Sequence, residues 1–293
     1  MMDILGYPLP VILGQLTLGF VNGSFYAILG LGLSIIFGML HIANFVHGAQ
    51  FMMGAFVAWI ALNYFGISYW WALIVGPAVM FAFGVLIEYT LLRRIYDLDH
   101  FYGLLMTFGL LLVIESVFRV YFGSLGLPYD NPLPGGTNIG FMFLPWYRAW
   151  VVVAGLVLCG ITWVVIERTK LGAYLRAATE NPDMVLAFGI NVPLLLTVTY
   201  GFGVALAGFA GVMAAPIQNV SPGMGNQLVI IIFALVVIGG LGSISGSIIT
   251  GYLLGLIEGL TKLYYPPAST VIIFVVMVLV LALRPAGLFG QKT

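Results

Sequence analysis

Long apolar runs separated by short polar stretches make up most of this chain. An α-helix rises about 1.5 Å per residue, so about 20 apolar residues span a hydrocarbon core of about 30 Å. Runs of 15 to 30 residues cover residues 11–40, 51–65, 72–92, 101–122, 150–166, 193–216 and 269–283. They predict a bundle of transmembrane helices.

The part from 227 to 264 is less regular. Residues 228–240 are strongly apolar but give only roughly 20 Å of helix, and 248–264 form another short run. Glycines and serines at 239–247 separate the two runs. Because a single helix over the whole part would be too long for one crossing, we expect a broken segment of two short helices. The fold predicted for residues 1–293 is therefore an all-α, polytopic transmembrane domain with about eight or nine membrane segments.

Residues 123–149 are rich in Gly, Pro and Asn, with scattered aromatic side chains. They show too little apolar periodicity to form a core of their own. We expect an ordered loop here, on the external, periplasmic side of the membrane.

The densest run of charge lies at residues 167–191, between two apolar runs. We expect two short helices there, because Asn181 followed by Pro182 interrupts a helical pattern. Thr169 is the predicted N-cap of the first helix, with Leu171, Tyr174, Leu175 and Ala178 on one face. Asn181 is the predicted N-cap of the second, with Pro182 at its first position and Gly189 at its end.

The second of these short helices is mostly apolar, with Met184, Val185, Leu186, Ala187 and Phe188 in sequence. A helix of roughly seven residues is not stable alone in water. It must therefore lie against an apolar surface. Either it folds back onto its own bundle, or it inserts into a cytoplasmic partner.

The composition agrees with a membrane protein. Apolar residues make up 62% of the chain and charged residues 7%, against about a quarter charged in soluble domains. The formal net charge is zero, which gives no indication of a nucleic-acid partner. The single cysteine, Cys159, is expected to be a small buried apolar side chain.

Basic residues predict the orientation, because cytoplasmic loops of membrane proteins are enriched in Lys and Arg. With nine crossings, one side holds Arg93, Arg94, Arg168, Lys170, Arg176, Arg284 and Lys292. The N-terminus is then outside and the C-terminus cytoplasmic. Eight crossings would move the tail outside, which Arg284 and Lys292 oppose.

Several polar residues interrupt the apolar pattern. Polar groups at membrane depth are tolerated where they are buried in protein or line a cavity. Asn44, His47 and Gln50 are therefore candidates for lining a translocation path, the alternative being that they satisfy helix ends at the cytoplasmic interface. The break at 239–247 exposes backbone groups, as discontinuous helices do in transport sites. Its Gly240, Ser243 and Ser245 are further candidates for the path, unless the break is only a hinge.

Charged residues inside the runs are expected to be structural. Glu115 and Arg119 are four positions apart, as are Glu258 and Lys262, a spacing at which opposite charges neutralise each other on one helix face. Glu88 lies near the end of its run and is expected to reach the membrane interface.

Catalytic chemistry has no support in the sequence. No phosphate-binding loop of the form G-x-x-x-x-G-K-[ST], no H-E-x-x-H and no G-x-S-x-G is present. His41 and His47 are six positions apart, which does not place them together on one helix face as a metal pair. We expect no catalytic residue, no metal site and no cofactor bound by this chain.

Several stretches resemble one known family. They are Glu-Arg-Thr-Lys-Leu-Gly-Ala-Tyr-Leu-Arg-Ala-Ala-Thr-Glu-Asn-Pro at 167–182, Ala-Phe-Gly-Ile-Asn-Val at 187–192, Asn-Phe-Val-His-Gly at 44–48, Gly-Gly-Leu-Gly-Ser-Ile-Ser-Gly at 239–246 and Arg-Pro-Ala-Gly-Leu-Phe-Gly at 284–290. The chain is similar to the membrane permeases of ATP-binding-cassette importers for branched-chain amino acids. The resemblance extends over nearly the whole length.

This resemblance implies that 167–191 is a coupling loop, which docks into a groove on a cytoplasmic ATPase. The loop residues expected to contribute are Arg176, Ala177, Glu180, Asn181, Pro182, Asp183, Ala187, Gly189 and Asn191. It also implies an assembly in a bacterial inner membrane, built from two related permeases, two ATPase subunits that bind Mg-ATP, and a periplasmic solute-binding protein. The implied cargo is a branched-chain amino acid.

Two alternatives stay open. Similar chains carry urea, short amides or other amino acids. A different class, an ion-coupled secondary transporter acting alone, is opposed by the lack of an unpaired acidic residue at mid-membrane, since Glu115 and Glu258 both have basic partners at helical spacing.

Overall fold

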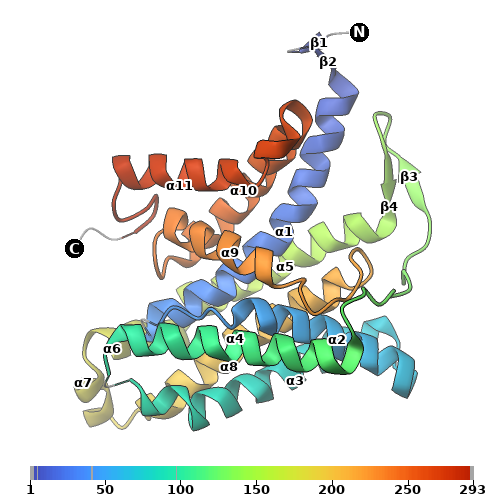
Figure 1. Ribbon diagram of the computed structural model, residues 1–293. Coiled ribbons are helices and arrows are strands. Elements are labelled where there is room, and N and C mark those ends of the chain that lie inside the picture. Colours follow the sequence, from blue (N-terminus) through green and yellow to red (C-terminus); the bar gives the residue numbers. More distant parts are fainter. Residues whose placement is uncertain (1–2, 5, 41, 97, 291–293) are drawn as a thin grey trace.

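The computed structural model describes residues 3–4, 6–40, 42–96 and 98–290, and shows a bundle of helices (Figure 1). The helices are α1 (Leu9–Leu40), α2 (His47–Phe65), α3 (Tyr69–Thr90), α4 (His100–Phe122), α5 (Trp146–Arg168), α6 (Lys170–Glu180), α7 (Pro182–Ala187), α8 (Val192–Ala214), α9 (Asn226–Gly239), α10 (Ile244–Tyr264) and α11 (Val271–Leu283). Short 3₁₀ turns at Leu92–Arg94 and Pro266–Ala268 follow α3 and α10. The predicted all-α class is confirmed.

Seven helices in the described part of the chain are long and apolar enough to cross a membrane. They are α1, α2, α3 with the 3₁₀ turn after it, α4, α5, α8 and α10. The apolar helices α9 and α11 are shorter. The number of membrane segments is therefore close to the predicted eight or nine.

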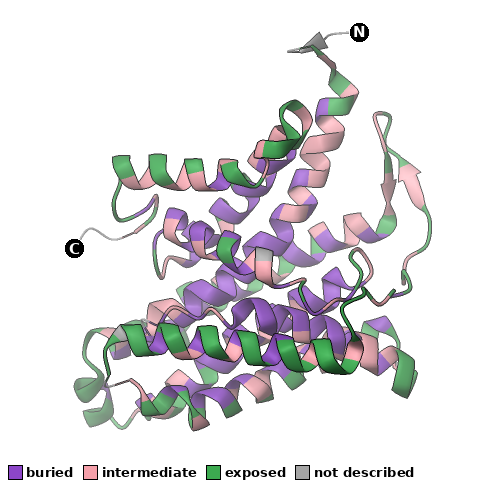
Figure 2. Ribbon diagram, in the orientation of Figure 1, coloured by how far each residue is buried: buried purple, intermediate pink, exposed green. Residues whose placement is uncertain are grey.

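Helix α1 lies at the centre of the bundle and α4 at its edge. Of the residues in the most apolar stretch of α1, 78% are buried, whereas 22% are buried in the corresponding stretch of α4. Figure 2 shows the same contrast, with α4 largely exposed and the helices behind it largely buried. Most of the exposed side chains of α4 are apolar, including Val113, Val117 and Val120, as expected of a helix that faces lipid.

Glycines let the central helices approach closely. A Cβ atom added to Gly19 of α1 would lie 2.6 Å from the carbonyl oxygen of Gly255 in α10. One added to Gly54 of α2 would lie 2.4 Å from the carbonyl oxygen of Gly208 in α8. Lipid tails are as apolar as leucine, so close backbone contact through small residues holds membrane helices together.

The broken segment is confirmed, but α10 begins at Ile244 and not at 248. The break is thus short, and α10 is long enough to cross a membrane. The Ser243 Oγ accepts a hydrogen bond from the Gly246 backbone nitrogen at 3.2 Å. This N-cap offsets the low helix propensity of the Gly and Ser residues that follow it.

The predicted start of the second apolar helix at 51 is also wrong, because α2 begins at His47. The sequence pattern suggested a polar interruption over residues 41–50. His47 and Gln50 are nevertheless fully buried, and both form hydrogen bonds inside the bundle. Internal partners allow the helix to extend through polar residues. His41 lies outside the described residues.

The predicted loop at 123–149 contains a β-hairpin, which the sequence pattern did not indicate. Strand β3 (Gly136–Asn138) pairs antiparallel with β4 (Phe143–Pro145). A second two-stranded pair, β1 (Asp3–Ile4) with β2 (Tyr7–Pro8), precedes α1. Residue 127 of the loop also forms a bridge with residue 220, after α8.

The bundle has two distinct ends. At the hairpin end, the Tyr7 ring lies 5.4 Å from the ring of Tyr264, where α10 ends. At the opposite end, which we call the α6–α7 end, Gly38 of α1, Arg176 of α6 and Phe289 line one cavity. The described part of the chain therefore begins at the hairpin end of the bundle and ends at the α6–α7 end.

Candidate functional site

The segment 167–191 folds as two short helices, α6 and α7, as predicted. The Asn181 Oδ1 accepts a hydrogen bond from the Met184 backbone nitrogen at 3.0 Å, and Pro182 is at the first position of α7. Gly189 has a φ of +81° just after the helix, a conformation that costs residues with a Cβ atom about 1–2 kcal/mol. Asn191 then caps α8 through Leu194.

The predicted capping role of the Thr169 side chain is wrong. Thr169 is at the N-cap position of α6, but its hydroxyl donates a hydrogen bond to the carbonyl oxygen of Val165 in α5. The last carbonyls of a helix lack intrahelical partners, and a threonine four residues on reaches them readily. The hydroxyl therefore serves the end of α5 and not the start of α6.

One side of α7 packs on the bundle and the rest is exposed. Val185 is buried with Ala178 of α6 and Val192 of α8. Met184, Leu186 and Phe188 are 57%, 47% and 78% exposed. Of the two alternatives predicted from the sequence, folding back onto the bundle therefore explains the burial of Val185 but leaves Met184, Leu186 and Phe188 without an apolar surface to cover them.

The apolar face predicted for α6 is also divided. Leu175 and Ala178 are buried, whereas Leu171 and Tyr174 are each 42% exposed. The residues predicted to couple to a partner, Arg176, Ala177, Glu180, Asn181, Pro182, Asp183, Ala187, Gly189 and Asn191, are all exposed. Together, α6 and α7 present many exposed residues, and those at and just after α7 include the apolar side chains of Met184, Leu186 and Phe188.

The predicted path residues Asn44, His47 and Gln50 form a buried polar cluster. The Asn44 Nδ2 donates to the Gln50 Oε1 at 3.3 Å, and the Gln50 Nε2 donates to the Tyr200 hydroxyl at 3.1 Å. The His47 Nε2 donates to the Leu29 carbonyl oxygen at 3.1 Å. All three residues are at most 2% exposed, and both sequence-based alternatives, lining a path and satisfying helix ends at the cytoplasmic interface, stay predictions.

Tyr200 is the member of this cluster that sequence reasoning missed. It is fully buried in α8 and its hydroxyl also lies 3.4 Å from the Asn44 Oδ1. The only sequence signal was a tyrosine with threonines nearby in an otherwise apolar run. A role of the cluster in translocation stays a prediction.

Glu88 is buried in the bundle and does not extend to the surface as predicted. It is 1% exposed, and its carboxylate accepts hydrogen bonds from the Thr197 hydroxyl at 2.5 Å and the Tyr96 hydroxyl at 2.7 Å. Burial, and next the hydrogen bond to Glu88, raise the pKa of Tyr96 above its ordinary value. Tyr96 therefore remains a proton donor to Glu88 at neutral pH. The hydrogen bond from Thr197 to Glu88 connects α8 to α3.

The two predicted intrahelical ion pairs are confirmed, and each has an additional partner. Glu258 binds Lys262 at 2.6 Å and accepts a hydrogen bond from the Tyr26 hydroxyl of α1 at 2.7 Å. The pair Glu115–Arg119 is similarly joined by Asn226, whose Nδ2 donates to Glu115 at 2.6 Å. Both pairs therefore also connect two helices. Cys159 is free and buried, as predicted.

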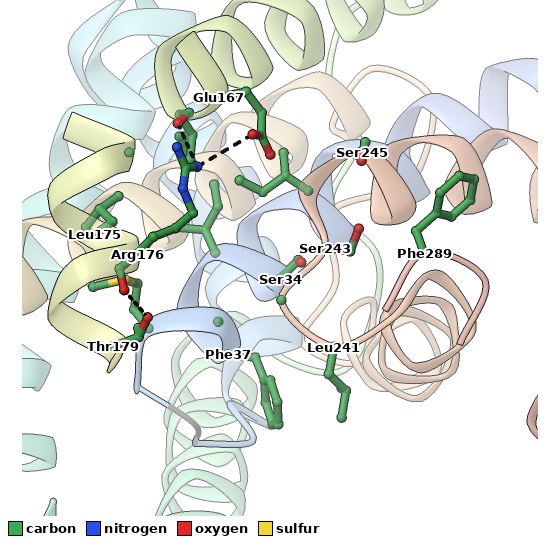
Figure 3. A pocket seen from close by; sticks show the side chains of 17 residues that line it. Ser34, Phe37, Glu167, Leu175, Arg176, Thr179, Leu241, Ser243, Ser245 and Phe289 are labelled. Atoms are coloured by element: carbon green, nitrogen blue, oxygen red, sulfur yellow. Dashed lines mark hydrogen bonds and ion pairs between the residues drawn. The ribbon is translucent and has the colours of Figure 1, made fainter. Parts of the chain in front are cut away.

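The break between α9 and α10 meets α6 at a cavity of about 560 Å³ (Figure 3). Arg176 lines one side of this cavity, and Ser243 and Ser245 line another. Gly240 lies beside the cavity, with a φ of +101° and its backbone against Gly290. The structure thus brings together one predicted coupling residue and two predicted path residues, whereas the cluster around Tyr200 lies elsewhere in the bundle.

Among the described residues, no group of three or more His, Cys, Asp or Glu side chains is placed to hold a metal ion. Three of the charged side chains that are buried, Glu88, Glu115 and Glu258, are instead held by hydrogen bonds or ion pairs. The geometry is that of a membrane bundle with a polar cluster inside it and an exposed surface at the α6–α7 end.

Comparison with known proteins identifies the family. The model of the family "branched-chain amino acid transport system / permease component" matches residues 15–281. The chain therefore belongs to this family of membrane permeases. It is a multi-pass membrane protein and a transport component, as expected.

Individual relatives agree with this assignment. The chain is 29% identical to the high-affinity branched-chain amino acid transport system permease protein BraD of Pseudomonas aeruginosa, over 95% of this chain and 96% of the relative. It is 28% identical to LivH of Escherichia coli K12, a protein of the same description, with the same coverage. It is also 25% identical to the permease LivM of Salmonella typhimurium, over 90% of this chain and 67% of the relative. No solved structure matches the chain.

Proposed function

We propose that this chain is one membrane subunit of an ATP-binding-cassette importer that carries branched-chain amino acids across a bacterial inner membrane. Relatives over nearly the full length are named as permeases of high-affinity branched-chain amino acid transport systems, which supports the cargo. The chain itself supplies half of the pore. ATP hydrolysis takes place on separate subunits.

The observation that carries this proposal is the exposed apolar tip of α7. Met184 and Leu186 of this six-residue helix, and Phe188 directly after it, are about half exposed or more, and they lie outside the helices that are long enough to cross a membrane. An apolar surface of this kind marks a protein interface. We assign it to a groove of a cytoplasmic ATPase that binds α7. Movement of the ATPase is then transmitted by α7 to α6 and α8.

Charge supports a cytoplasmic position for the α6–α7 end. The basic residues at this end are Arg93, Arg94, Arg168, Lys170, Arg176 and Arg284. Since positive residues are retained in the cytoplasm, the N-terminus lies outside and the hairpin end faces the periplasm. A periplasmic solute-binding protein would then deliver cargo at the hairpin end. Lys292, which the sequence also placed on the cytoplasmic side, lies outside the described residues.

A second, related permease completes the pore in this proposal. The chain matches both the LivH and the LivM permeases, the latter at lower identity. Two different permeases of one family support a heterodimer, with membrane lipid around the exposed apolar faces of helices such as α4. No nucleic-acid partner is expected.

Reconstitution into vesicles tests the function. Uptake of radiolabelled leucine should require ATP inside the vesicle, the ATPase subunits, and the binding protein outside. A sodium or proton gradient without ATP should give no uptake. Uptake that the gradient alone drives would instead identify an ion-coupled transporter. Competition by urea, acetamide and other amino acids separates the alternative cargoes.

A further inference from the structure

The cavity between α6 and the α9–α10 break has an unusual balance of charge. Two charged residues line it, Arg176 and Glu167, and the rest of its lining is uncharged. The lining therefore has no net charge but holds one charge of each sign. A simple anion or cation would gain one favourable contact there and suffer one unfavourable contact.

The Arg176–Glu167 pair is weakly formed in the structure. The Arg176 Nη1 lies 3.5 Å from the Glu167 Oε2 and donates a hydrogen bond to the Ile166 carbonyl oxygen at 3.4 Å. Both side chains are exposed, at 53% and 38%. A guanidinium group has five N–H donors, and among the described residues Arg176 makes no other hydrogen bond or ion pair. Most of its donors are therefore open to a ligand.

Further polar groups border the same space. The Ser34 hydroxyl is fully buried and has no hydrogen-bond partner among the described residues. Ser243 and Ser245 lie opposite Arg176 and Glu167 (Figure 3). A buried hydroxyl without a partner is unfavourable, and a polar ligand at the cavity would supply the missing partner.

The remaining lining is apolar and includes Met39, Leu175, Leu241 and Phe289. A cavity of about 560 Å³ is within the range of about 300–1,000 Å³ common for small-molecule sites. A ligand that suits this site carries a positive and a negative group a short distance apart, together with an apolar side chain. A free α-amino acid with an aliphatic side chain has this chemistry.

We propose that the cavity binds a zwitterionic, aliphatic α-amino acid, with its carboxylate on Arg176 and its ammonium group on Glu167. The ligand would lie beside the Arg176–Glu167 pair, so that each of its two charges faces the opposite charge of the protein, while its side chain packs against Leu241 and Leu175. This inference rests on the proposed function in one respect, the side of the membrane. The proposed orientation places the site on the cytoplasmic side, beside α6, the helix that leads into α7.

Binding of radiolabelled leucine to the purified full-length chain in lipid nanodiscs tests the proposal, without ATPase or binding protein present. We expect saturable binding to one site. Leucinamide, which lacks the carboxylate, and 4-methylpentanoate, which lacks the ammonium group, should each compete at least tenfold more weakly than leucine. These two ligands probe both charges on the unaltered protein, so the test does not depend on the folding of a variant.

Variants locate the site. Arg176→Gln should weaken leucine binding at least tenfold, and Leu241→Trp should abolish it by filling the cavity. Arg168→Gln is the matched control, because Arg168 lies close by in sequence but does not line the cavity, and its guanidinium is 5.7 Å from the ring centre of Trp163. Equal binding by Arg176→Gln and Arg168→Gln, or no saturable binding, would overturn the proposal.

The two proposals fail in different ways. ATP-dependent uptake without leucine binding to the isolated chain would reject the cavity as a site and leave the importer function in place. Binding that responds to Arg176→Gln and Leu241→Trp, combined with gradient-driven uptake, would retain the site and reject the importer function.

Discussion

The interior of the bundle and the α6–α7 end use apolar residues in opposite ways. Where α1 meets α10 and α2 meets α8, glycines remove side chains so that backbones touch, as at Gly19 and Gly54. By contrast, the large side chains of Leu186 in α7 and of Phe188 directly after it are exposed. In lipid, close packing is the main attraction between helices. Outside lipid, exposed apolar surface indicates a partner. Small residues between helices therefore indicate packing within the bundle, whereas large exposed apolar residues near α7 indicate assembly with a partner.

The largest effect is expected from crowding the interior. Gly54→Leu should destabilise the protein by about 3 kcal/mol or more, because the new side chain meets the backbone of Gly208, which has no room to move. Thermal unfolding in detergent, followed by light scattering, measures this. The control is Gly160→Leu in α5, where an added Cβ has no neighbour within 4 Å. Equal loss of stability in both variants would show that close packing at Gly54 is not important.

Changing the tip of α7 should affect assembly and not stability. Phe188→Asp should weaken binding of the ATPase by about 2 kcal/mol, or about thirtyfold, with little change in unfolding temperature. Co-purification and a binding titration measure the loss. The control is Leu125→Asp, which is 81% exposed at the hairpin end and should leave ATPase binding unchanged. Full recovery of the ATPase with Phe188→Asp would remove the assigned interface.

The hydrogen bond between Tyr26 and Glu258 tests how polar groups stabilise the interior. Tyr26→Phe should cost about 1.5 kcal/mol, because a buried carboxylate loses a donor. Thermal unfolding of Tyr26→Phe and of Tyr64→Phe, a tyrosine that is 71% exposed, gives the comparison. Similar unfolding temperatures for these two variants would mean that Lys262 alone satisfies Glu258.

The smallest effect is expected at the end of α7. Gly189→Ala should cost about 1 kcal/mol locally, because alanine is strained at a φ of +81°. Faster hydrogen exchange of the α7 amides, with unchanged exchange in α8, would report this local fraying. An effect on α8 of the same size would show that α7 is not an independent unit.

Local features of the fold could be read from the sequence. Asn181 and Gly189 are the cap and the stop of α7, because both signals depend on neighbouring residues only. The pair Glu258–Lys262 follows from helical spacing alone. The two helices of the broken segment follow from their length and from the glycines and serines between them.

Features that depend on distant residues could not be read in this way. Tyr26 is 232 positions from Glu258, and Tyr200 is 150 positions from Gln50, so no spacing rule connects them. The burial of Glu88 was not predicted, because its hydrogen-bond partners Thr197 and Tyr96 come from other segments. In each case the missing information was which helices lie side by side.

Photo-cross-linking from position 188 tests the central claim most directly. A benzoylphenylalanine placed at Phe188, in the assembled transporter, should form an adduct with the ATPase subunit. The same group at Val185, which is 5% exposed and packs on its own bundle, should cross-link within the chain only. An adduct with the ATPase from position 188 and none from position 185 is the predicted result. No ATPase adduct from position 188 would contradict the account.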